Sequence, residues 1–205
     1  WRMQYGKSID DWTSALGPDY RNRNSGPACV VMLLHYKKRA GIKSDFGSFS
    51  DGRFPKIHAD SRWKFCRLNE DRGYPGGFEE DDQADVSADE LAGVLSGEDI
   101  PAILHTGADK VTIERIAAIV SQSNLAVCRV DPSAYFGDER PGESRWIVVY
   151  AVTPDGVIVH DPGRDEGRSR GVPKKEFLEA LRLADGGSGP AMLECLTMVG
   201  NHGDG

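Results

Sequence analysis

The segment that decides the fold is Asn24-Ser25-Gly26-Pro27-Ala28-Cys29, which leads into the strongest helical pattern of the chain. That pattern continues as Val30-Val31-Met32-Leu33-Leu34-His35-Tyr36-Lys37-Lys38-Arg39-Ala40 and stops at Gly41. Proline is favoured in the first turn of a helix and glycine just past its end, so we predict a helix over 27–40. Apolar side chains occupy nearly every face before Lys37, which indicates a central, buried helix.

The rest of the chain divides into an irregular stretch and an ordered one. Residues 42–86 show little periodicity and include the acidic run 79–82, so they are expected to form an irregular excursion. A capping box at Ser87–Glu90 and a second start signal at Thr112 predict two short helices.

Strands follow the helices. We predict strands over 125–130, 146–152 and 157–160, a helix from Pro173, and a closing strand over 191–199. The strands over 146–152 and 157–160 are joined by Thr153-Pro154-Asp155-Gly156, which is typical of a hairpin turn. Helices first and an antiparallel hairpin afterwards favour an α+β fold.

Composition narrows the class of protein. The 205 residues fit one domain, 1–205, and 25 Lys and Arg against 32 Asp and Glu give a net charge of −7. This acidic balance argues against a nucleic-acid partner, because phosphate is repelled. No apolar run approaches the roughly 20 residues of a membrane span, and the first residues lack the apolar core of a signal peptide, so a soluble protein is expected. Compartment and oligomeric state stay open.

Cysteine and histidine usage predicts no metal or other cofactor. The four cysteines, Cys29, Cys66, Cys128 and Cys195, show no CxxC spacing, and three of the four lie in apolar surroundings as small buried hydrophobes would. The histidines His58, His105 and His202 have no partner at ligand spacing, and His35 is read as a core residue on the buried helix.

The start of the buried helix is where nucleophilic chemistry is expected. A nucleophile there meets the positive end of the helix dipole, and backbone N–H groups can face an oxyanion. Residues 24–29 resemble the Cys-Gly-Pro-Ala opening of the bacteriocin-processing (double-glycine leader) cysteine peptidases, members of the papain-like superfamily. The resemblance implies a papain-like α+β fold, with a helical subdomain packed against an antiparallel sheet across a cleft.

A second motif extends the resemblance. Ser144-Arg145-Trp146-Ile147-Val148-Val149-Tyr150 followed by Val159-His160-Asp161-Pro162 resembles the family's His-Trp-Val-Val-Val … Asn-Asp-Pro hairpin, whose His is the general base and whose Asp orients it. Asp161 follows Arg145 by the family's 16 positions. Gly73-Tyr74-Pro75-Gly76-Gly77 resembles the Gly-rich loop of the wider group and is read as a wall of the cleft. The resemblance thus implies ligand contacts at Asn24, Gly26, Tyr74, Gly76 and Trp146.

The triad-equivalent positions depart from the family. Ser25 stands at the nucleophile position, Arg145 at the base position, and Asp19 where a Gln donates to the oxyanion. An Arg guanidinium cannot accept a proton near neutral pH, and an ionised carboxylate cannot donate one. The thiol–imidazole reaction therefore cannot run on these residues, and we predict an inactive member of the group, bacterial or phage in origin, that binds a peptide or protein.

Several alternatives stay open. The chain is an active cysteine peptidase or acyl-transfer enzyme if its parent carries Cys at position 25, or a structural piece of a larger assembly. Ser25 also fits the purely structural role of a helix cap. Arg145 and Asp161 also fit the role of a structural ion pair. His160 is considered as a displaced base, but strand alternation directs it away from Asp161.

Overall fold

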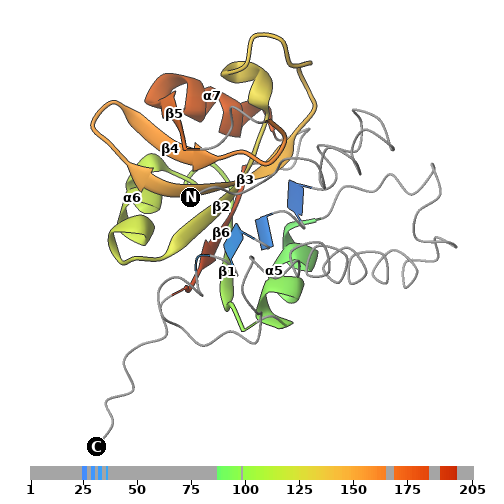
Figure 1. The fold of residues 1–205 in the computed structure, drawn as a ribbon, viewed down its shortest axis with the longest axis vertical. Helices are drawn as coiled ribbons and strands as arrows, with labels where there is room; N and C mark the ends of the chain where they lie inside the picture. Colours follow the sequence, from blue (N-terminus) through green and yellow to red (C-terminus); the bar gives the residue numbers. More distant parts are fainter. Residues whose placement is uncertain are drawn as a thin grey trace, which may run out of the picture.

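The computed structural model describes residues 87–97, 99–164, 169–184 and 190–197, together with helical residues at 25–26, 29–30, 32–33 and 36. These residues form a mixed α/β fold around a six-stranded antiparallel sheet (Figure 1). The strands are ordered β1-β6-β2-β3-β4-β5, with bounds β1 Ala102–Thr106, β2 Leu125–Val130, β3 Arg145–Val152, β4 Gly156–His160, β5 Arg170–Pro173 and β6 Ala191–Cys195. The last strand in the chain thus lies inside the sheet, between the first two.

Helices cover both faces of this sheet and divide the apolar interior into two cores. The first core packs the helical residues Cys29, Val30 and Leu33, together with α5 (Ala88–Gly97), against one face. The second core packs α6 (Ile113–Ser121) and α7 (Lys174–Leu183) against the other face. Figure 1 shows α6 and α7 on one side of the sheet and α5 on the other. Side chains alternate along β3, so Trp146 and Val148 belong to the first core and Ile147 and Val149 to the second.

The local signals in the sequence produce the expected contacts. Ser87 and Glu90 form the capping box before α5: the Ser87 N–H donates to Glu90 Oε2 at 2.9 Å, and the Glu90 N–H donates to Ser87 Oγ at 3.4 Å. Thr112 caps α6 by accepting the Arg115 N–H at 3.2 Å. In the β3–β4 hairpin the Thr153 N–H donates to the Gly156 carbonyl at 2.8 Å. A short 3₁₀ helix, η2 (Pro132–Ala134), follows β2.

The structure corrects three parts of the predicted element pattern. Strands β1 and β5 were not predicted, because each is short and β5 contains both Gly171 and Pro173. The closing strand ends at Cys195 within the described residues, rather than at 199. Helical structure is present at Ser25 and Gly26, before the predicted start at Pro27. The predicted excursion over 42–86 lies outside the described residues.

The capping box makes a direct prediction about stability. Replacing Ser87→Ala removes the acceptor for the Glu90 N–H and should lower the free energy of unfolding by about 1 kcal/mol. Urea denaturation followed by circular dichroism measures the change. Ser121→Ala is the matched control, since that hydroxyl donates to the Ala118 carbonyl at an exposed position, and it should leave the midpoint almost unchanged. Equal losses in both variants would contradict the capping role.

Candidate functional site

The start of the buried helix lies directly against the start of β3. Ser25 is 1% exposed, and its Oγ accepts a hydrogen bond of 2.9 Å from the Trp146 backbone N–H. Position 25 therefore lies next to position 145, although 120 residues separate them in sequence. The Ser25 hydroxyl here binds a backbone donor of the neighbouring strand, which is an interaction that the sequence did not predict.

Arg145, the first residue of β3, forms a buried ion pair with Asp161, which follows β4. Its Nη2 donates to Asp161 Oδ2 at 2.8 Å, and its Nε lies 2.7 Å from Oδ1. The two side chains are 1% and 0% exposed. The contact was predicted as a structural ion pair, and its burial makes it strong in the low dielectric of the interior.

Asp161 also accepts hydrogen bonds from two other segments. The Gly163 N–H donates to Oδ1 and the Tyr135 hydroxyl donates to Oδ2, both at 2.9 Å. Position 163 requires glycine, because a Cβ there would lie 2.7 Å from the Arg145 guanidinium carbon. The backbone of the loop after β4 thus packs directly onto the plane of the guanidinium.

A second carboxylate, which the sequence analysis missed, neutralises the other side of Arg145. Glu139 Oε1 accepts from Nη1 at 3.1 Å and from Nη2 at 3.2 Å, and it also accepts from Arg164 at 3.4 Å. The Phe136 ring packs against the same charges, with Arg145 5.8 Å and Arg164 4.6 Å from its centroid. Glu139 stands in an acidic loop stretch, Asp138-Glu139, which carries no pattern that predicts this partner.

The pKa shifts of the cluster follow from burial and from the Asp161 charge. Burial alone would lower the pKa of Arg145, but the charge of Asp161 and its hydrogen bond outweigh burial and raise it. Burial raises the pKa of Tyr135 well above its ordinary value, and the neighbouring Asp161 raises it further. Arg145 therefore stays a cation and Tyr135 a neutral donor, so neither group can take a proton from Ser25.

Strand alternation places the Arg145 side chain on the face of β3 opposite to that of Trp146, which belongs to the first core. Tyr135 and Phe136, which contact Asp161 and Arg145, belong to the second core. His160 lies on the opposite face, where its Nδ1 accepts the Ser169 N–H at 3.1 Å. His160 therefore points away from Asp161, as alternation predicted.

Cys29 is the thiol nearest to Ser25 in sequence. It is fully buried in the first core, and burial, followed by the Asp161 charge, raises the pKa of its thiol well above the ordinary value. Cys128 and Cys195 are also buried and free, and burial raises their pKa values as well. Protonated, inaccessible thiols are poor nucleophiles, so these cysteines belong to the cores.

Of the remaining predicted site residues, some lie in the part of the chain that the structure describes and others lie outside it. Gly26 is buried in the helix beside Ser25, and the Trp146 side chain is fully buried in the first core. Trp146 thus faces the interior, and its backbone N–H is the group that meets Ser25. Asp19, Asn24, Tyr74 and Gly76 lie outside the described residues.

In the part of the chain that the structure describes, no helix is long and apolar enough to cross a membrane. Among the same residues, no group of three or more His, Cys, Asp or Glu side chains is arranged to hold a metal ion.

Comparison with known proteins gives a distant structural likeness. No family model matches the chain, and no curated protein matches it. Among solved structures, the fold is similar to a crystal structure described as a C39-like peptidase from Bacillus anthracis. The identity is 17%, the TM-score is 0.41, and the match covers 54% of this chain and 59% of that chain.

The buried ion pair predicts a large and specific loss of stability. Asp161→Asn keeps the shape of the side chain but removes the charge that faces buried Arg145, and should cost about 3 kcal/mol of unfolding free energy. Chemical denaturation measures this loss in the free energy of unfolding. Asp138→Asn is the control, because Asp138 is an exposed partner of Arg164, and it should leave stability almost unchanged. A similar small loss in both variants would contradict the importance of burial.

A double-mutant cycle separates pairing from packing. Arg145→Gln combined with Asp161→Asn leaves no charge on either side of the pair, so the double variant should lose clearly less than the sum of the two single losses. Strictly additive losses would show that each side chain acts through its own packing.

Proposed function

We propose that this chain is a catalytically inactive cysteine-peptidase-like domain that binds a peptide or protein in the place of the former substrate cleft. The observation that carries the proposal is the state of position 145. A general base is required there, and the residue present is a guanidinium held between Asp161 and Glu139. This arrangement fills the space of a base with a permanent cation.

The nucleophile position supports the same conclusion. A serine hydroxyl becomes a nucleophile only when a neighbouring base takes its proton. The Ser25 Oγ is buried and accepts the N–H of Trp146, and the residue just before Trp146 is the cation Arg145. The 16-residue spacing and the helix-start motif are retained, while Ser25 and Arg145 stand in place of the thiol and the imidazole. This pattern is expected when a fold is kept for binding.

Activity assays test the loss of chemistry. The purified protein should hydrolyse neither peptide nor thioester substrates, and iodoacetamide should label Cys29 only after denaturation, because burial raises the pKa of its thiol. Ser25→Cys places a thiol at the helix start but supplies no base, so it should stay inactive, like the matched Ser25→Ala. Robust hydrolysis by Ser25→Cys would instead establish an enzyme whose parent sequence carries Cys at position 25.

Peptide binding is tested separately. Panning a randomised peptide library against the protein should enrich binders, and a bound peptide should slow hydrogen exchange at the Trp146 N–H and at the helical residues near Ser25. The amides of α7 are the internal control, since α7 lies on the other face of the sheet. Failure to enrich any peptide, or protection confined to α7, would contradict binding at this place.

A further inference from the structure

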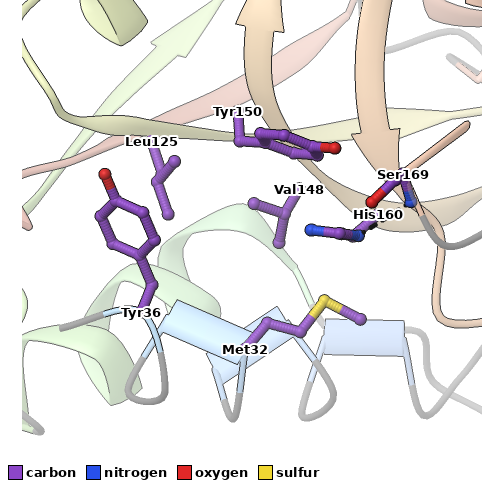
Figure 2. Close-up of a pocket in the computed structure, with 7 residues that line it drawn as sticks. All are labelled: Met32, Tyr36, Leu125, Val148, Tyr150, His160 and Ser169. Carbon is purple, nitrogen blue, oxygen red and sulfur yellow. Dashed lines mark hydrogen bonds between the residues drawn. The ribbon is translucent and has the colours of Figure 1, made fainter. Parts of the chain in front are cut away.

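A cavity of about 300 Å³ lies between the buried helix and the sheet, apart from the ion pair. It is lined by Met32, Tyr36, Leu125, Val148, Tyr150, His160 and Ser169. Figure 2 shows Met32 and Tyr36 projecting from the helix on one side, and the rings of Tyr150 and His160 on the other. Met32 follows Ser25 by seven residues, about 10 Å along a helix, so the cavity is distinct from the triad-equivalent positions.

The backbone of β3 is irregular at this cavity. Val149 pairs with Val159 and Ala151 pairs with Ile158, so Tyr150 is an extra residue opposite β4. Such bulges re-aim a side chain and are frequent beside binding sites. Here the Tyr150 ring stacks on His160, with centroids 4.4 Å apart and an interplanar angle of 17°. The stacked pair gives the cavity a flat aromatic side.

The lining is mostly apolar. Among the described residues that line the cavity, none is Lys, Arg, Asp or Glu. His160 Nδ1 accepts the Ser169 N–H, an interaction that uses the lone pair of a neutral imidazole. A charged ligand would lose its hydration here without an opposite charge in return. The facing groups, a methionine thioether and stacked rings, are those that hold a flat ring between them.

We propose that this cavity binds an uncharged one- or two-ring aromatic small molecule, inserted between Met32 and the Tyr150–His160 pair. The volume fits the lower end of small-molecule sites. The site is independent of the proposed peptide-binding place, because Ser25 and Arg145 are not among its lining residues.

The test uses the full chain and 2-naphthol, which is uncharged at pH 7, with ¹³C-methyl-labelled methionine. The Met32 methyl signal should shift on titration, whereas that of Met192, buried in the second core, should not. The anion 2-naphthoate has the same rings and should bind at least about tenfold more weakly. Absence of a Met32 shift up to the solubility limit, or equal affinity for naphthoate, would overturn the proposal.

Variants of the lining residues test whether 2-naphthol binds in this cavity. Tyr36→Ala removes a wall at a half-buried position and should weaken 2-naphthol binding at least about fivefold, while Val148→Phe fills the cavity and should abolish it. Leu178→Ala, at an exposed position of α7, is the control and should bind as the parent does. If Val148→Phe fails to fold, Tyr36→Ala decides the question, and unchanged binding in that variant would overturn the assignment.

Discussion

The buried carboxylate of Asp161 is the constraint around which one end of the molecule is arranged. A charge with no exposure must be compensated inside the protein. Here it is compensated from three segments at once: Arg145 at the start of β3, Tyr135 after η2, and the Gly163 amide in the loop that follows β4. Each donor needs a fixed backbone position, and Gly163 needs the absence of a side chain. The geometry of the β3–β4 end therefore follows from satisfying one carboxylate.

The same carboxylate explains why an arginine fits at position 145. An Asp that would orient an imidazole offers two acceptor oxygens, and a guanidinium can use both. An imidazole changes its charge near neutral pH, whereas Arg145 keeps its charge and gains a second partner in Glu139. The residue at 145 is thus unable to transfer protons but well able to hold the end of the hairpin together.

Local signals in the sequence predicted the helix starts and the hairpin turn. The features that the sequence analysis missed depend on contacts between residues far apart in the chain. The Ser87–Glu90 box, the Thr112 cap and the Thr153–Gly156 turn each act within a few residues, so they could be read directly. Strand β1 depends on pairing with β6, almost ninety residues away, and its five residues carry no clear alternation. Glu139 and Tyr135 also meet Arg145 and Asp161 only through the fold. The 16-residue spacing predicted the ion pair, because a hairpin brings its two ends together.

The sheet keeps the Arg145–Asp161 ion pair apart from the cavity. Alternation at neighbouring residues sends Arg145 to the second core and Trp146 to the first, and it sends Asp161 and His160 to opposite faces in the same way. A binding event in the cavity therefore meets His160 and Tyr150 without touching the ion pair. Conversely, the backbone N–H of Trp146 joins the sheet to the helix start through Ser25. The strand that holds the cation at one face thus positions the helix at the other, so a change in ion pairing that moves the backbone of β3 also reaches Ser25.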